Sequence, residues 1–413
     1  MNPASLIFLF TYILVSLGEN SPRKLDRPTA TLLGAVLMVV TGALSRAEAR
    51  AAIDVSTLAV LFGLMVLLAV LVQSGLPAWA AFRVLSRYPR PQVLLPLVVF
   101  TAGISAAIML NDTVCLLGTP LLLHMTERQG LRPTPFLLAL ATSANIGSVM
   151  TLTGNPQNII IGHASGWSWL GFALRMIPIG LVCLAVNWLL LALLYRSSLR
   201  PAPQTETAVA APHPPLQPDL ALKSGIVLAG LIAAFLLSAP MDIAAVSAAV
   251  ALLVWANRPP REALGKVDWS LLLFFAGLFV VVAGFVKAEA HLLSRLIAYL
   301  GTQVGSATII QVSVATVLGS NIFSNVPFVL IVSHWVKEMS HPQFVWLLLS
   351  LTSTLAGNLT LFGSVANVIV AQDAQPKVHL GFSDFLRVGV PVTLVTTAVG
   401  VLLLWLFWVW GWV

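Results

Sequence analysis

Long apolar segments, separated by short polar ones, make up most of the sequence. A helix needs about 17–25 mainly apolar residues to cross the hydrocarbon core of a bilayer. Ten segments meet or approach this length, near residues 3–18, 29–44, 54–75, 135–162, 168–195, 222–238, 241–257, 268–287, 343–372 and 386–410. The pattern predicts an all-α polytopic membrane protein with these segments as its transmembrane helices.

Two further apolar regions have a polar break at their centres. Region 92–126 contains Asn111-Asp112-Thr113, and region 306–336 contains Ser324-Asn325-Val326-Pro327. Each pattern fits either a kinked pair of spans or a hairpin that enters the membrane and returns to the same side. We predict re-entrant hairpins, and we call 111–113 the first tip and 324–326 the second tip.

Segment 135–162 is interrupted by Thr-Gly-Asn-Pro-Gln-Asn at residues 153–158. Gly and Pro break a helix, and unwound backbone at membrane depth persists only where protein or a water-filled cavity satisfies its polar groups. Segment 343–372 carries a related interruption at 363–367. We therefore predict two broken helices, which are the form that many transporter binding sites take.

The two halves of the chain carry the same landmarks in the same order and at nearly constant spacing. Asp54 and Asp268 each precede an apolar run, and the break at 154–158 parallels the one at 363–367. Each half holds five full crossings. Because five is odd, the second half must be inverted relative to the first. The sequence thus predicts two inverted repeats, an architecture of secondary transporters.

A Pro-rich polar segment, 196–221, separates the repeats 1–195 and 222–413 and is typical of a flexible linker. Sixteen of the 22 Lys and Arg residues fall on the linker's side of the predicted topology and six on the other. Positive loops face the cytoplasm. We therefore expect a multi-pass protein of the cell inner membrane with a cytoplasmic linker and both termini outside.

Composition excludes a soluble protein. Of the 413 residues 58% are hydrophobic and 9% are charged, whereas a soluble domain carries about 25% charged residues. The net charge of +7 does not indicate a nucleic-acid partner, because the basic residues lie in loops between apolar segments. Cys115 and Cys183 both lie in apolar segments and suggest neither a disulfide framework nor a metal site.

The two tips and two broken helices together predict a central substrate site. Short helix N-termini carry free N–H groups and a positive dipole end, which attract an anion. Carboxamides and hydroxyls at the breaks can bind an oxyacid; these are Asn111, Thr113, Ser148, Thr153, Asn155, Asn158, Ser324, Asn325, Ser364 and Asn367. The alternative is that the amides only cap helix ends.

Asp112 is the one acid that we place at the middle of an apolar region. Carboxylates inside a membrane are costly and are functional by default. We predict that Asp112, with Asn155 and Thr151, binds the coupling ion, H⁺ or Na⁺; the alternative is a neutral structural Asp. Asp54 and Asp268 directly precede apolar runs, and we expect both to be N-caps.

These motifs resemble those of the ion transporter superfamily, over nearly the whole chain. The motifs that carry the resemblance are the two tips, Thr-Gly-Asn-Pro-Gln-Asn-Ile-Ile-Ile at 153–161 and the segment 357–367. They are most similar to the branch of arsenite permeases, citrate–metal symporters and P protein-like anion permeases. The resemblance implies a homodimer built on scaffold domains, and a transport domain with both hairpins and both broken helices that moves as an elevator.

Two positions depart from the symporters of that superfamily. Asp112 brings a carboxylate into the first tip, and Val326 stands in the second tip where the symporters have Thr. Both departures disfavour a dicarboxylate–sodium symporter and are compatible with the arsenite-permease branch. The leading prediction is efflux of arsenite or antimonite by proton antiport. The alternatives are a dicarboxylate, citrate or sulfate permease coupled to Na⁺ or H⁺, and a Na⁺/H⁺ antiporter.

Other classes of function fit the sequence less well. No Walker motif is present, so ATP-driven transport within this chain is not expected, although the chain could conduct ions for a separate cytoplasmic ATPase or form a channel. No nucleophile–base pair or His-rich metal set suggests an enzyme. We expect no cofactor beyond the coupling ion, and the lipid bilayer as the surrounding partner.

Overall fold

The computed structural model describes residues 2–17, 25–86, 90–199, 215–291, 294–295 and 303–413, and these residues form helices and connecting turns without any strand. The first half contains α1 (Pro3–Leu17), α2 (Arg27–Val40), α3 (Arg46–Ala52), α4 (Val55–Gln73), α5 (Leu76–Leu85), α6 (Pro91–Ile108), α7 (Asn111–Arg128), α8 (Thr134–Ser148), α9 (Pro156–Ser165) and α10 (Trp169–Leu194).

The second half contains α11 (Pro218–Leu236), α12 (Met241–Trp255), α13 (Pro260–Leu264), α14 (Trp269–Ala288), α16 (Ser306–Phe323), α17 (Asn325–Val336), α18 (Pro342–Ala356), η2 (Leu361–Gly363), α19 (Val365–Asp373) and α20 (Phe382–Val409). Seven described helices are long and apolar enough to cross a membrane, namely α4, α6, α10, α11, α14, α16 and α20. The predicted all-α polytopic class is confirmed.

The same order of elements occurs twice along the chain. Helices α6 and α7 meet at the first tip, α8 and α9 are separated by a turn, and the long α10 follows; α16 to α20 repeat this order. In both halves a helix ends shortly before the predicted tip, at Ile108 and at Phe323, and the next helix begins within the tip, at Asn111 and at Asn325. That the α6–α7 and α16–α17 hairpins re-enter the membrane, and that the repeats are inverted across it, stay predictions.

Two helix pairs form the frame beside these hairpins. Helix α4 packs along α12, and α2 packs along α14. A Cβ on Gly63 would lie 2.5 Å from the Ala245 carbonyl carbon, and one on Gly277 would lie 2.7 Å from the Thr31 carbonyl carbon. Small residues allow such close approach in membrane helices. Gly63 corresponds to Gly277 and Thr31 to Ala245 in the order of the two halves, so the two pairs are structural equivalents.

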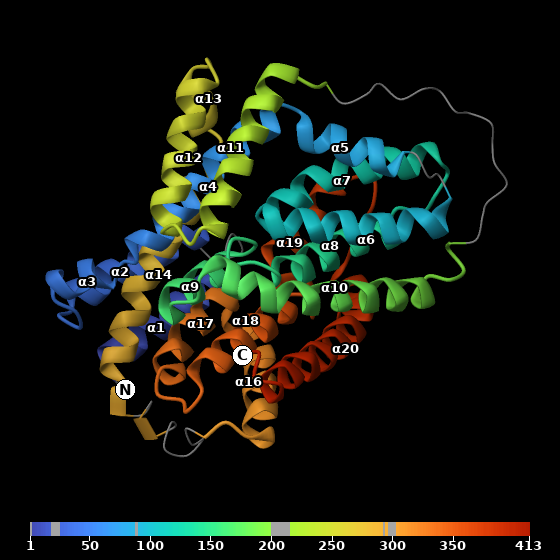
Figure 1. Ribbon diagram of the computed structural model, residues 1–413. Helices are drawn as coiled ribbons and strands as arrows, with labels where there is room; N and C mark the ends of the chain where they lie inside the picture. The colour runs from blue at the N-terminus through green and yellow to red at the C-terminus, as the bar shows by residue number, and fades with distance from the viewer. Residues whose placement is uncertain (1, 18–24, 87–89, 200–214, 292–293, 296–302) are drawn as a thin grey trace.

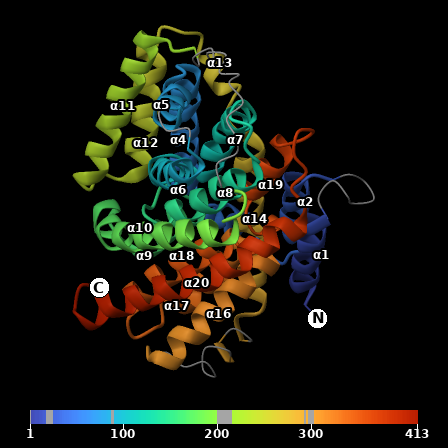
Figure 2. The same cartoon turned by 90° about the vertical axis from the view of Figure 1, so that its right-hand side faces the viewer.

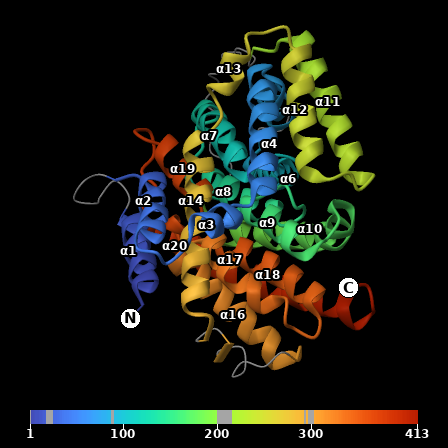
Figure 3. The same ribbon diagram turned by 90° about the vertical axis from the view of Figure 1, so that its left-hand side faces the viewer.

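The helices form two groups in space. Helices α4, α11, α12 and α13 lie together at the top of Figure 1, with α1, α2 and α14 at its left. The hairpins and broken helices lie on the other side with α10 and α20, which pack against each other (Figure 2). Figure 3 shows α1 and α2 beside α14 from the opposite direction. Helices α8 and α18 form the centre of the second group, since Pro135–Ser148 and Phe344–Ala356 are entirely buried.

Two details differ from the sequence prediction. Helix α11 begins at Pro218 rather than at residue 222, because the Gln217 backbone N–H donates to the Ser74 carbonyl (2.9 Å) and holds the end of the linker in place. Residues 200–214 of the predicted linker lie outside the described residues. The short helices α3, α5 and α13 were not predicted; α3 starts with a Ser45–Glu48 capping box, a signal that the sequence does contain.

Candidate substrate and coupling-ion site

The N-terminal ends of four helices border one cavity of about 450 Å³. Helices α7 and α17 contribute the two tips, and α9 and α19 contribute the second halves of the broken helices. Parts of α1, α2 and α14 line the cavity from the other group of helices. Helix N-termini offer unpaired N–H groups and a positive dipole end, so this arrangement suits a ligand with oxygen atoms.

Matching hydrogen bonds hold both broken helices open. The Asn158 Nδ2 donates to the carbonyls of Ser148 (3.0 Å) and Thr151 (3.2 Å). The Asn367 Nδ2 donates to the carbonyls of Gly357 (2.8 Å) and Thr360 (2.9 Å). The donor and both acceptors have the same relative spacing in each half of the chain. Asn158 thus satisfies two backbone carbonyls that the end of a helix leaves unpaired. Asn367 does the same for Gly357, and it shares the Thr360 carbonyl with the Gly363 N–H (3.1 Å).

The turns themselves need glycine. A Cβ on Gly154 would lie 2.6 Å from the Ser148 carbonyl oxygen, and one on Gly363 would lie 2.9 Å from the Gly357 carbonyl oxygen. After the first turn, Asn155 is extended at φ −150° and Pro156 opens α9 at a position where its missing N–H costs no helix bond. The predicted break therefore follows from local residues.

The first tip joins the cavity to the first broken helix. The Asn111 backbone N–H donates to the Gly154 carbonyl (3.2 Å), and the Asn111 side chain is only 2% exposed. Asp112 is half-buried, lines the cavity and lies in the first turn of α7, where the helix dipole stabilises a carboxylate. Asn155 lines the same cavity.

The second tip is built on a strained residue. Ser324 adopts φ 69° and ψ 156°, a backbone conformation that non-glycine residues rarely adopt. It brings Ser324 and Asn325 to the cavity wall, together with Ser364 from the N-cap of α19. Strain of this kind persists only where the surrounding packing enforces it, and it occurs frequently at binding sites.

Six of the residues predicted from the sequence do not line the cavity; they are Thr113, Ser148, Thr151, Thr153, Asn158 and Asn367. Asn158 and Asn367 cap the broken helices, as the capping alternative expects. The Thr151 hydroxyl donates to the Ala107 carbonyl (2.6 Å), so it ties the broken helix to α6. The Thr153 hydroxyl accepts from the Trp169 indole (3.1 Å). Asn158, Asn367, Thr151 and Thr153 thus form the support behind the cavity wall.

Sequence reasoning missed the residue at the centre of this support, Asn145 of α8. Its Nδ2 donates to the Oδ1 atoms of Asn358 (2.9 Å) and Asn367 (3.1 Å). Its Oδ1 accepts from the Asn111 Nδ2 (3.0 Å) and the Ser364 hydroxyl (2.9 Å). Asn145 lies eight residues before the predicted break at 153–158, within the part of the segment that we read as ordinary helix. The available signal was the buried Asn itself, since polar groups inside membrane helices are costly.

Three amide oxygens in the cavity wall are left without a hydrogen-bond partner. They are Asn111 Oδ1, Gln157 Oε1 and Asn325 Oδ1, each on a residue that is at most 8% exposed. The Gln157 Nε2 is directed away, toward the hydroxyls of Ser353 (3.2 Å) and Thr354 (2.7 Å). Buried acceptors of this kind normally find a partner. A ligand with hydroxyl groups, or a cation, would supply one.

Three charged groups line the cavity. Arg27 and Asp268 approach from α2 and α14, and Asp112 approaches from the first tip. Asp268 is also the predicted N-cap, because its carboxylate accepts from the Leu271 N–H (2.9 Å), and Asp54 likewise accepts from the Thr57 N–H (3.0 Å). Both N-cap predictions are confirmed. The wall thus has more negative than positive side chains.

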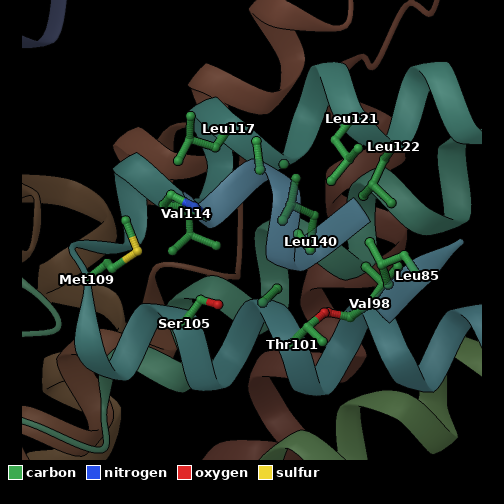
Figure 4. A pocket seen from close by; sticks show the side chains of 15 residues that line it. Leu85, Val98, Thr101, Ser105, Met109, Val114, Leu117, Leu121, Leu122 and Leu140 are labelled. Carbon is green, nitrogen blue, oxygen red and sulfur yellow. The ribbon is translucent and has the colours of Figure 1, made fainter. Parts of the chain in front are cut away.

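A second cavity, of about 70 Å³, lies between α5, α6, α7 and α8 and is lined mainly by apolar side chains such as Leu85, Val98 and Leu140 (Figure 4). Its polar side chains are Thr101 and Ser105, and the Thr101 hydroxyl already donates to the Leu97 carbonyl (2.5 Å). No charged residue lines it. This cavity therefore lacks the groups that a charged or hydroxyl-rich substrate needs.

The known proteins that this chain is similar to are transporters. The family model described as CitMHS, citrate transporter, matches residues 12–353. The silicon efflux transporter LSI3 of Oryza sativa subsp. japonica is 32% identical over 447 residues, which cover 91% of this chain and 92% of that protein. The putative transporter arsB of Dictyostelium discoideum is 25% identical, over 96% of this chain and 91% of that protein.

A solved structure shares the fold. The crystal structure of the Alcanivorax borkumensis YdaH transporter matches with a TM-score of 0.63 at 17% identity, over 100% of this chain and 99% of that chain. The family and these relatives are transporters, not enzymes. The chain belongs to the CitMHS citrate-transporter family of the ion transporter superfamily.

Proposed function

We propose that the protein is a secondary active transporter that exports an uncharged oxyacid, arsenous or antimonous acid, in exchange for protons. The observation that carries this proposal is the set of three unpartnered amide oxygens in a cavity bordered by four helix N-termini. Amide oxygens accept hydrogen bonds from hydroxyl groups, and the N–H groups at helix ends donate to oxygen atoms. A molecule with several hydroxyl groups uses both.

The charges of the wall support an uncharged substrate over a polyanion. Asp112 and Asp268 would repel sulfate or citrate, and Arg27 is the single basic side chain among the lining residues. Arsenous acid is uncharged near neutral pH, as is silicic acid, the aqueous form of silicon. The names of the relatives LSI3 and arsB point to the same chemical class.

Asp112 is the proposed proton carrier. It is half-buried at the cavity wall, next to Asn111, whose side-chain oxygen has no hydrogen-bond partner. A carboxyl group in such a place can bind a proton when the substrate leaves and release it when the substrate returns, which couples the two fluxes. Thr151 points to the Ala107 carbonyl instead, so Asp112 and Asn155 remain the proposed ion ligands.

Transport requires that the two groups of helices move relative to each other. We propose that α6–α10 and α16–α20 form the moving elevator domain and that the remaining helices form the scaffold of a homodimer. Arg27 and Asp268, on the side predicted to be cytoplasmic, border the open cavity. On the opposite side α9 contacts α4, where His163 Nδ1 lies 3.0 Å from the Thr57 hydroxyl and 3.5 Å from the Asp54 carboxylate. This conformation is therefore proposed to be open to the cytoplasm.

An anion permease is the second candidate. The description of the family model as a citrate transporter favours it, and so do the converging helix N-termini and Arg27. If an anion were carried, the unpartnered amide oxygens would bind Na⁺, which prefers oxygen ligands. The presence or absence of sodium dependence therefore separates the two candidates.

The test is transport by purified protein in proteoliposomes without ATP. Vesicles loaded with arsenite, antimonite, silicate, sulfate or citrate are given an inward proton gradient, with and without Na⁺. We expect the proton gradient to accelerate efflux of the uncharged acids, without any sodium requirement. Sodium-dependent movement of citrate or sulfate with no arsenite flux would establish the second candidate instead, and unitary currents in planar bilayers would indicate a channel.

A further inference from the structure

A chain of side-chain amides leads from the second broken helix to the first tip. It runs from Asn358 and Asn367 through Asn145 to Asn111, and all four residues are at most 2% exposed. Three of its bonds join side chains from separate elements of the fold, with donor–acceptor distances of 3.0, 2.9 and 3.1 Å. Only Asn111 at the end of the chain lines the cavity.

Backbone carbonyls fix the direction of this chain, because a carbonyl can only accept. Asn367 donates both of its amide hydrogens to the carbonyls of Gly357 and Thr360, and Asn358 donates to the carbonyl of Thr142 (3.3 Å). The oxygens of Asn358 and Asn367 must then face Asn145. Asn145 has two amide hydrogens, and it uses one for each of these oxygens.

The orientation of Asn145 determines that of Asn111. With its nitrogen occupied, Asn145 presents its oxygen to the first tip, where it accepts from the Asn111 Nδ2 (3.0 Å) and from the Ser364 hydroxyl (2.9 Å). The Asn111 nitrogen is therefore bound to Asn145, and the oxygen is the side-chain atom left for a ligand. Its Oδ1 is buried and without a partner at the wall.

We propose that Asn145, which does not line the cavity, is a positioning residue that makes the site selective for hydroxyl donors over oxyanions. It does so by holding the Asn111 oxygen toward the substrate. An oxyanion at this position meets another oxygen acceptor, whereas the hydroxyl of an undissociated acid donates to it. The proposal rests on the proposed function, because it explains why the uncharged acid is preferred.

The test compares arsenite with arsenate, which has ionised oxygens in place of some hydroxyls, as substrates or competitors in proteoliposomes. In Asn145→Leu the Asn111 amide is free to turn, and we expect the ratio of arsenite to arsenate affinity to fall by about tenfold, the equivalent of one hydrogen bond.

Asn187→Leu is the matched control. Asn187 is also buried and also bonds to α8, through the hydroxyls of Thr142 (3.0 Å) and Ser143 (2.9 Å), but it has no bond to the amide chain. Its loss should leave the ratio unchanged. An equal fall in Asn187→Leu, or no fall in Asn145→Leu, overturns the proposal.

A double-mutant cycle separates positioning from general loosening of the structure. If Asn145 acts through Asn111, the Asn111→Leu,Asn145→Leu double variant should have the same ratio as Asn111→Leu alone; additive effects would contradict the proposal. If Asn145→Leu cannot be purified as a monodisperse protein, Asn111→Leu is the deciding variant. An unchanged ratio in Asn111→Leu would show that the Asn111 oxygen does not distinguish arsenite from arsenate, which overturns the proposal.

Absence of arsenite transport by the wild-type protein would instead refute the proposed function. If the ratio of arsenite to arsenate affinity changes in the variants only when Na⁺ is present, the Asn111 oxygen binds a cation, and the proposal is also overturned.

Discussion

Asn158 and Asn367 hold matching positions in the two halves of the chain, and each donates its side-chain amide to two backbone carbonyls at the end of the preceding helix. The Thr360 carbonyl also accepts from the Gly363 N–H (3.1 Å), whereas the carbonyls of Ser148, Thr151 and Gly357 depend on these amides. Each net hydrogen bond contributes about 0.5–1.5 kcal/mol, and each unsatisfied buried group costs about 1–3 kcal/mol. We therefore expect Asn158→Ala and Asn367→Ala each to destabilise the fold by about 2–4 kcal/mol.

The measurement is the thermal midpoint of the detergent-purified protein, followed by fluorescence or by loss of monodispersity. Thr41→Ala serves as a control, since its exposed hydroxyl bonds only to the Leu37 carbonyl within its own helix (2.8 Å). Its midpoint should remain close to that of the wild type. Midpoints for both Asn variants equal to that of Thr41→Ala would show that the amides do not stabilise the breaks.

The turn after α8 makes a second prediction. A methyl group on Gly154 would lie 2.6 Å from the Ser148 carbonyl oxygen, and backbone cannot move aside as a flexible side chain can. Gly154→Ala should therefore displace the first tip, whose Asn111 N–H binds the Gly154 carbonyl, and reduce transport by about tenfold or more. Gly230→Ala in α11 is the matched control, because its added methyl group meets nothing within 4 Å and removes a helix-destabilising glycine. Transport by Gly154→Ala at the wild-type rate would contradict this account of the turn.

Much of the fold could be predicted because it depends on local signals. Apolar length predicts the membrane helices, and Gly154 and Pro156 predict the first break. The roles of the polar residues depended on long-range packing. Asn155 and Asn158 lie in the same polar break, yet Asn158 caps the end of the preceding helix α8 and Asn155 borders the cavity.

For Asp268, the sequence predicts the local role but not the position in the fold. Its position before an apolar run correctly predicts an N-cap, but its place beside the cavity depends on how α14 packs against the tips. Asn145 could not be placed from the sequence, because its partners Asn358 and Asn367 come from the other half of the chain. Contacts between the two halves of the chain leave no pattern in the local sequence from which they could be predicted.

The contact between α9 and α4 predicts a way to trap one conformation. If the two groups of helices move relative to each other, the Thr57 and His163 side chains, now 3.0 Å apart, must separate during each cycle. Thr57→Cys,His163→Cys treated with a short thiol crosslinker should lose transport almost completely, and reductant should restore it when the linker contains a disulfide. Thr57 is buried in this conformation, so the reagent is applied during turnover, when the proposed motion separates the two positions. The wild-type protein, which contains Cys115 and Cys183, should keep its activity under the same treatment. Full activity of the crosslinked protein would exclude motion at this contact.

The predicted sidedness can be measured at Ser270, which is exposed and borders the cavity near Asp268. Charge places this end of α14 in the cytoplasm. A membrane-impermeant maleimide should label Ser270→Cys in inside-out vesicles and leave it unlabelled in right-side-out cells. Arsenite present during labelling should slow the reaction, because substrate would occupy the same cavity. Labelling only from outside would reverse the orientation of both repeats and assign the open side of the cavity to the exterior.

Asp112 provides the most direct test of coupling. Its carboxylate lines the cavity within the first turn of α7, and Asn retains its size while losing the ability to carry a proton. Asp112→Asn should therefore abolish transport driven by a proton gradient while still allowing arsenite-for-arsenite exchange, which needs no net proton movement. The measurement is proteoliposome flux in both modes, with the thermal midpoint showing that the variant is folded. Asp242→Asn is the control, since that carboxylate bonds to the Ser56 hydroxyl (2.7 Å) and does not line the cavity. If Asp112→Asn keeps full gradient-driven flux with the wild-type pH dependence, the proton must be carried elsewhere, and Asp268 becomes the next residue to replace.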